Sequence, residues 1–270
     1  MIRYPWRSIL AVLTLLLPQP AAPRAPAVAI EHAQLMSSLM LDGQLFHVQG
    51  VELETRSIWV TSVDRKNHKG YLHEFDRASG RFLRRLELTD GARYHPGGIS
   101  ISGRSIWVPV AEMKRNSTTV LEEIDADSLQ IRRKIYVADH LGCVAASART
   151  LIAGNWNSKL FYIFDLDNIA PMRVVANPSS TRYQDMKMFG DQLVAGGSLN
   201  HRSGTIDWID WPTMQLTRTL RTGVTSPLKP SGQIRSYSNE GMTLQGRELY
   251  VIPEDGPSRM YHFRLDDQAR

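Results

Sequence analysis

The chain has 270 residues, with 32 Lys and Arg against 27 Asp and Glu, which gives a formal net charge of +5. Three of the positive charges, Arg3, Arg7 and Arg24, lie in the first 29 residues, where no acid offsets them, so the remainder carries only +2. Because its Lys and Arg form no long run, the composition argues against a nucleic-acid partner. The single cysteine, Cys143, excludes an internal disulfide.

The N-terminal segment has the pattern of a secretory signal. Arg3 and Arg7 precede an apolar run at 8–17, Pro18 breaks that run, and Ala27-Val28-Ala29 places small residues where a signal peptidase reads them. About ten apolar residues are too few for a membrane-spanning helix, which needs roughly twenty. We therefore predict a signal peptide over 1–29, cleavage after Ala29, and an exported protein, periplasmic or extracellular, whose mature chain has no transmembrane segment.

The rest of the chain repeats one unit five times. Each unit begins with a polar cluster and continues through short hydrophobic strands, the third of which ends in an apolar residue and an acid in the first four copies. The clusters lie at 47–50, 95–98, 140–143, 183–186 and 238–241. Short antiparallel strands that recur every ~45 residues are typical of propeller blades. The sequence predicts an all-β chain that forms a single five-bladed β-propeller over 30–270, with blades at about 44–91, 92–137, 138–178, 179–223 and 235–270.

The fifth unit ends at Arg270 without a fourth strand, whereas the segment 35–43 resembles the fourth strand of the first unit at 83–91. We therefore expect residues 34–41 to supply the outer strand of blade five and to close the ring, which protects two sheet edges. The acids at the ends of the third strands have a structural explanation, because an acid at the start of a turn accepts backbone N–H groups. They are Asp76, Asp125, Asp165 and Asp210.

The polar clusters are the candidate site, because inner strands of a propeller begin at the mouth of its central channel. Residues two apart on a strand share a face, so an alignment on Gly50, Gly98, Cys143, Met186 and Gly241 predicts two layers. The first layer contains His47, His95, His140, Tyr183 and Ser238. The second contains Gln49, Gly97, Gly142, Asp185 and Glu240.

Three imidazoles beside two carboxylates suit a borderline metal ion. His47, His95, His140, Asp185 and Glu240 are the predicted ligands of zinc, manganese or iron, and calcium would use the oxygen donors alone. Asp185 or Glu240 is the candidate general base. The alternative is a structural plug in which the histidines hydrogen-bond backbone groups and water. Cys143 is expected to be a small buried hydrophobe, with a nucleophilic role as the alternative.

A small-molecule ligand would contact the same mouth, because ligand sites prefer concave regions with convergent polar groups. No organic cofactor is indicated. The predicted ligand-binding residues are Gln49, Tyr183, Gln184, Asn239, Asn155, Trp156, Glu254 and Asp255.

The clusters at 47–50, 95–98, 139–142, 183–185 and 239–242, with Pro-Glu-Asp-Gly at 253–256, resemble an uncharacterised family of exported bacterial propeller-like proteins, the domain of unknown function DUF6454. That resemblance implies the fold and an exported setting, and it brings no activity. A more distant resemblance is to five-bladed glutaminyl cyclotransferases, whose Phe-Thr-Gln-Gly motif is similar to 46–50; their Glu-Gly-Trp-Gly segment is replaced here by 140–143. Glu240 in Asn-Glu-Gly-Met is similar to the Glu-Gly motif of gluconolactonase and strictosidine synthase-like propellers.

Two functions follow from these patterns. One is an exported propeller that binds a small molecule or metal ion at its channel mouth. The alternative is a metal-assisted hydrolase, lactonase or cyclotransferase that uses the same residues. A protein-interaction scaffold is a third possibility, which predicts an exposed apolar patch on the blades.

Overall fold

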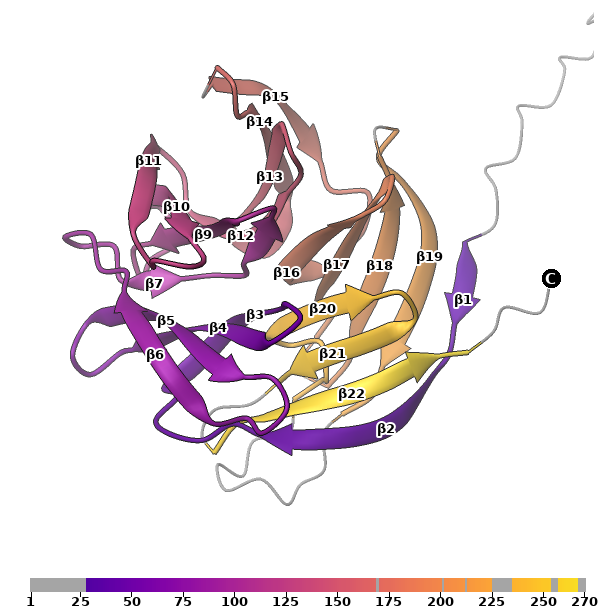
Figure 1. The fold of residues 1–270 in the computed structure, drawn as a ribbon. Coiled ribbons are helices and arrows are strands. Elements are labelled where there is room, and N and C mark those ends of the chain that lie inside the picture. Colours follow the sequence, from indigo (N-terminus) through magenta and orange to yellow (C-terminus); the bar gives the residue numbers. More distant parts are fainter. Residues whose placement is uncertain are drawn as a thin grey trace, which may run out of the picture.

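The computed structural model describes residues 28–168, 170–200, 202–211, 213–224, 235–253 and 257–266. Their strands form five sheets around a central axis, which confirms the predicted five-bladed β-propeller (Figure 1). The predicted signal peptide lies outside the described residues except for its last two positions. No helix within the described ranges is long and apolar enough to cross a membrane.

The blades are antiparallel sheets whose first strand lies nearest the axis (Figure 1). Blade 1 comprises β3 (His47–Leu53), β4 (Ser57–Asp64), β5 (Lys69–Asp76) and β6 (Phe82–Glu87). Blade 2 comprises β7 (His95–Pro96), β8 (Ser100–Ser102), β9 (Ser105–Ala111), β10 (Thr119–Asp125) and β11 (Ile131–Val137). Blade 3 comprises β12 (Leu141–Ala146), β13 (Thr150–Asn155), the 3-10 turn η1 (Trp156–Ser158), β14 (Leu160–Asp165) and β15 (Ala170–Ala176). Blade 4 comprises β16 (Arg182–Phe189), β17 (Gln192–Ser198), β18 (Gly204–Asp210) and β19 (Gln215–Thr222), and blade 5 comprises β20 (Gly241–Gln245), β21 (Glu248–Ile252) and β22 (Arg259–Leu265).

The N-terminal strands join two blades. As predicted, β2 (Ala33–Met40) pairs antiparallel with β22 and completes blade 5. In addition, β1 (Ala29–Glu31) pairs parallel with β19 and adds a fifth strand to blade 4, which the repeat pattern did not predict. Glu31 is buried there and forms an ion pair with Arg218 at 2.7 Å. The first described residues therefore tie blades 4 and 5 together.

Apolar side chains fill the space between neighbouring blades. Trp59, Trp107 and Trp208 come from the second or third strands of their blades and are almost fully buried. Trp59 packs with the core of blade 2, Trp107 with that of blade 3 and Trp208 with that of blade 5. Burying a large apolar side chain contributes about 1.5–3 kcal/mol. The apolar contacts between neighbouring blades therefore provide much of the stability of a chain that cannot form an internal disulfide.

The repeated acids close turns, as expected. The Asp76 carboxylate accepts hydrogen bonds from the backbone N–H of Ser79 at 2.9 Å and from its hydroxyl at 2.6 Å. Asp125 does the same with Ser128, at 2.8 Å for both contacts. These local bonds account for the recurring acid through turn geometry alone.

A β-bulge near the start of three inner strands shifts the predicted alignment in one blade. The pairing slips at Gln49 in β3, at Gly142 in β12 and at Gln184 in β16. Gln184, and not Asp185, is therefore level with Gln49 and Gly142. The prediction that aligned Asp185 with Gln49 was off by one residue, because the extra residue of a bulge cannot be read from the apolar pattern.

The inner strands approach one another very closely around the axis, and glycine permits this. A Cβ atom on Gly50 would lie 2.8 Å from Gly98 Cα, closer than real Cβ atoms come. Gly98 also forms a parallel bridge with Cys143 of the next blade. Glycine at these positions therefore lets the inner strands of neighbouring blades come into backbone contact.

Candidate functional site

A hollow of about 220 Å³ lies at the channel mouth and collects side chains from blades 1 to 4. Two wider hollows, of about 420 and 430 Å³, draw their lining from at most two neighbouring blades and their connection. The channel-mouth pocket is lined by His47, Gln49, Arg65, His95, Met113, His140, Gly142, Asn155, Trp156, Asn157, Tyr183 and Gln184.

The structure brings together all three predicted histidines in this pocket. The rings of His95 and His140 are 5.8 Å apart, and Trp156 meets His140 edge to face at 4.4 Å. Gln49 Oε1 lies 3.2 Å from His95 Nε2, which couples blade 1 to blade 2. Burial holds the pKa of His95 down at about 3, and His140, His47 and Arg65 act in the same direction. Burial also lowers the pKa of His140, so both imidazoles are neutral at neutral pH.

The remaining predicted ligand-binding residues divide into three groups. Asn155, Trp156, Tyr183 and Gln184 line the pocket with Gln49. Asn239 does not line it; its amide lies between the Ser198 hydroxyl and the Glu240 carboxylate. Glu254 and Asp255 lie outside the described residues.

Local contacts fix the position of the aromatic and amide residues. The backbone N–H of Trp156 donates to His140 O at 2.9 Å, and Asn155 Oδ1 accepts from Leu160 N at 2.9 Å. Tyr183 donates its hydroxyl to Asp207 at 2.7 Å, so its polar end is already engaged in blade 4. The pocket wall is thus held by contacts that do not need a ligand.

The two predicted catalytic carboxylates, Asp185 and Glu240, do not line the pocket. Asp185 is completely buried, and its Oδ2 accepts the backbone N–H groups of Val51 at 3.0 Å and Met242 at 3.1 Å. Because the blade-4 bulge turns this side chain to the axis, it joins the inner strands of three blades. Glu240 is also buried, and its Oε1 accepts Arg235 at 2.9 Å and Asn239 at 2.6 Å.

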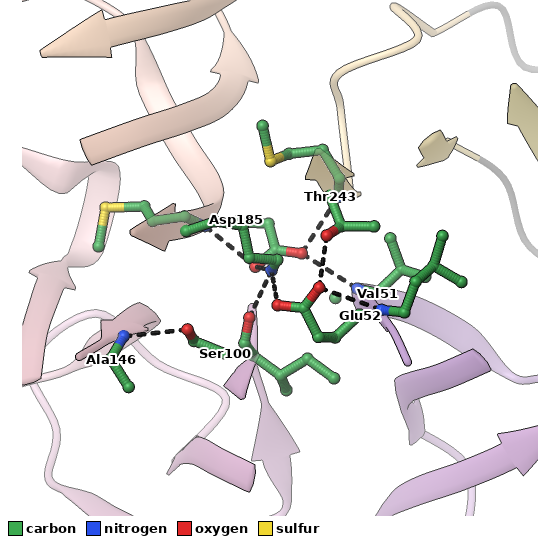
Figure 2. A network of polar contacts seen from close by, with 12 residues as sticks. Val51, Glu52, Ser100, Ala146, Asp185 and Thr243 are labelled. Carbon is green, nitrogen blue, oxygen red and sulfur yellow. Dashed lines mark hydrogen bonds and ion pairs between the residues drawn. The ribbon is translucent and has the colours of Figure 1, made fainter. Parts of the chain in front are cut away.

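A buried charge cluster joins the inner strands of several blades; we call it the axial network, and Figure 2 shows its Glu52, Asp185 and Thr243. It contains Asp185, Lys187, Glu52 and Thr243. Lys187 Nζ lies 2.6 Å from Asp185 Oδ1 and 3.9 Å from Glu52 Oε2, and it also donates to the carbonyl of Ile99. Thr243 donates its hydroxyl to Glu52. Burial raises the pKa of Glu52 and of Asp185, and the Lys187 ammonium opposes both shifts.

The structural plug expected from the sequence was to be formed by the histidines; the buried cluster at the axis is formed by other residues. The histidines lie around the open pocket instead. Within the described ranges, no three His, Cys, Asp or Glu side chains are grouped so as to hold a metal ion. Of the predicted metal ligands, the three histidines line the pocket, Asp185 belongs to the axial network, and Glu240 belongs to neither.

Cys143 has the properties of a core residue. It is fully buried, its Sγ lies 3.8 Å from Tyr183 O, and burial raises its pKa to about 12. Such a thiol provides almost no thiolate at neutral pH.

Sequence reasoning missed Arg65 and Met113 in the pocket and Glu52 and Lys187 in the axial network. Arg65 belongs to a polar loop with no distinctive motif. Lys187 had a usable signal, because a lysine within the apolar run of an inner strand needs a buried partner. Its nearer partner, Asp185, is two residues away on the same strand, whereas the second, Glu52, lies three blades away along the chain and could not be identified from the sequence.

Comparisons with known proteins agree with this fold. No curated protein sequence matches the chain. The glutaminyl cyclase of Myxococcus xanthus has a similar structure, with a TM-score of 0.66 and 14% sequence identity over 89% of this chain and 99% of that one. A structure of the mitotic checkpoint complex gives a TM-score of 0.47 at 15% identity, covering 96% of this chain and 100% of that one. BamB from Moraxella catarrhalis gives 0.42 at 11% identity, covering 82% and 59%.

The first of these similarities supports the propeller fold alone, and the other two are too weak to support an argument. The family match is more extensive, because residues 24–269 match a family of unknown function, DUF6454. The chain therefore belongs to the DUF6454 family.

Proposed function

We propose that this propeller binds a small polar molecule in the channel-mouth pocket, without turnover. The observation that carries the proposal is the convergence of His47, His95 and His140, from three blades, on one pocket of about 220 Å³. Gln49 and Trp156 add an amide and an aromatic edge to it. Concave sites with a few convergent polar groups are where proteins usually bind small ligands.

The chemistry of the lining favours binding over catalysis. Among the described residues that form the pocket wall, none is Asp or Glu. A general base works best when its pKa is near the working pH, and burial keeps the pKa of His95 at about 3. The buried Cys143 thiol does not line the pocket either.

A thermal-shift screen with a metabolite library tests this proposal. Ligands of the pocket are expected to stabilise the wild-type protein and to lose that effect in Trp156→Ala. Trp211→Ala is the matched control, because Trp211 is similarly half-buried but packs in the outer part of blade 4. Hits that respond equally to both variants, or no hit at all, would contradict the proposal.

The alternative is a hydrolase, lactonase or cyclotransferase assisted by zinc, manganese, iron or calcium. Elemental analysis of protein purified in metal-free buffer tests for the metal, with His95→Ala as the variant that should lose it. Product formation tests for turnover, and a peptide that begins with glutamine belongs in that assay because of the structural similarity to a glutaminyl cyclase. Stoichiometric metal or multiple turnovers would replace the binding proposal.

Export remains part of the proposal. N-terminal sequencing of the protein from its native host is expected to begin at Ile30. That cleavage keeps Glu31 and its ion pair with Arg218 in the mature chain. An intact N-terminus would argue against export by this route.

A further inference from the structure

The charge of the channel-mouth pocket has one source. Arg65, in the loop between β4 and β5, is the only charged side chain among the described residues that line the pocket. It forms no ion pair or hydrogen bond with any residue that the structure describes. Its charge reaches the pocket interior, because it contributes to the low pKa of His95. The pocket therefore has a positive side with no bound counter-charge from the described protein.

The nearby acids are already engaged. Glu112 Oε2 forms an ion pair with Lys114 at 2.8 Å, and its Oε1 accepts the backbone N–H of Thr118 at 3.2 Å. Asp139 accepts the backbone N–H of His140 at 2.8 Å and the Tyr162 hydroxyl at 2.9 Å. Neither acid lines the pocket, so neither replaces an anionic ligand beside Arg65.

The hydrogen bonds of Gln49 determine the tautomer of His95. Gln49 Nε2 donates to Val48 O at 2.9 Å, which leaves Oε1 as the atom 3.2 Å from His95 Nε2. An amide oxygen only accepts, so His95 Nε2 carries the hydrogen. In the neutral ring Nδ1 then has a lone pair, and this buried atom has no partner among the described residues.

A similar argument fixes His140. Its Nδ1 lies 2.9 Å from Lys114 O, and a carbonyl oxygen requires a donor, so Nδ1 carries the hydrogen. The Ser117 hydroxyl is 3.1 Å from the same nitrogen. Nε2 of His140 therefore has the lone pair, without a hydrogen-bond partner in the described part of the chain. The pocket therefore offers the imidazole acceptor of His140 and the guanidinium of Arg65, whereas Nδ1 of His95 is enclosed by protein atoms.

From these two groups we infer that the channel-mouth pocket selects organic carboxylates that also carry a hydroxyl or an amide N–H. The guanidinium of Arg65 pairs with the carboxylate, and the lone pair of His140 Nε2 accepts from the ligand's donor. A cationic ligand is disfavoured because it would meet Arg65 without an opposing acid. This inference rests on the binding role proposed above and defines its ligand class.

Isothermal titration calorimetry with matched probes tests the charge requirement. D-gluconate is compared with D-sorbitol, and N-acetyl-L-alanine with N-acetyl-L-alaninamide, because the members of each pair are close in size and only one is an anion. The anion of each pair is expected to bind about tenfold or more tightly, the range for a hydrogen bond to a charged group. Hexanoate tests the donor requirement, since it has the carboxylate of gluconate without hydroxyls, and it is expected to bind more weakly.

Two variants assign the effect to the pocket. Arg65→Gln is expected to abolish the preference for anions. Arg56→Gln removes one positive charge from the turn between β3 and β4, at the opposite end of blade 1. This control variant is expected to keep the preference for anions. Equal binding of anionic and neutral partners would overturn the inference while leaving the binding role intact. Binding of none of the five probes would also overturn it, and the metabolite screen would then decide the binding role separately.

Discussion

Replacing Lys187 with methionine tests whether the axial network holds the ring together. Lys187 is 4% exposed and Asp185 0%, and the ammonium lies 2.6 Å from one carboxylate and 3.9 Å from another. The variant leaves two buried carboxylates, on Asp185 and Glu52, without their cation. Breaking a buried ion pair by removing one partner usually costs about 3–5 kcal/mol, and we expect a loss of that size in the free energy of unfolding at neutral pH.

The pH dependence of this variant gives a second, independent result. Without the ammonium, burial raises the pKa values of both carboxyl groups further above their unfolded values. The folded state then binds protons that the unfolded state does not, so stability rises as the pH is lowered from neutral toward the unfolded pKa of Asp185, 3.8. The Lys187→Met variant should therefore recover part of its lost stability in mild acid.

Urea denaturation monitored by circular dichroism at several pH values measures both effects. Lys69→Met is the matched control, because Lys69 forms an exposed pair with Glu87 at 2.7 Å, and it should change stability little at any pH. The double variant Lys187→Met with Asp185→Asn should be more stable than Lys187→Met alone at neutral pH, since one uncompensated charge is gone. A Lys187→Met protein as stable as the control, or one without recovery in acid, would refute the reasoning.

Three further results are expected. Burial lowers the pKa of His73 to about 3, so the folded state excludes a proton that the unfolded state binds, and stability should fall as the pH drops below about 6.5. Because His95 has the same low pKa, His73→Leu should make that decline shallower without removing it, as measured by urea denaturation. Because Cys143 is buried with a pKa of about 12, a thiol reagent should label it only after unfolding, and rapid labelling of the native protein would contradict this. Gly98→Ala would place a Cβ atom 2.6 Å from Asp185 Cα and should destabilise by about 1–3 kcal/mol, whereas Gly223→Ala, with open space around it, should have little effect on the melting temperature.

The repeat pattern predicted the architecture well because blade strands are short, regular and locally encoded. The apolar-acid pairs mark the ends of β5, β10, β14 and β18 in the structure. The closure by β2 was also predictable, since 35–43 resembles a fourth strand. The parallel strand β1 was not, because three residues carry no periodicity.

The site was predictable only in part. The histidines were correctly placed at one mouth, since their blades share a common register. Asp185 was assigned to the same mouth, and a single bulge residue, Gln184, turns it to the axis instead. Lys187 and Glu52 show the general difficulty: a buried lysine and an acid two residues away on its strand are visible in the sequence, whereas a second partner from another blade depends on how distant strands meet.

The pairing of β2 with β22 has a consequence for how the molecule forms. Ala33 lies opposite Leu265, so one of the first described strands pairs with the last, across almost the whole length of the chain. Contacts between such distant residues slow folding, because the chain loses the entropy of a long loop before the contact stabilises it. During synthesis, β2 and its exposed Leu35 and Met40 have no sheet to join until the C-terminal strand is made. Truncating the chain before β22 should therefore leave β2 without a partner strand and blade 5 incomplete, even though β1 can still pair with β19.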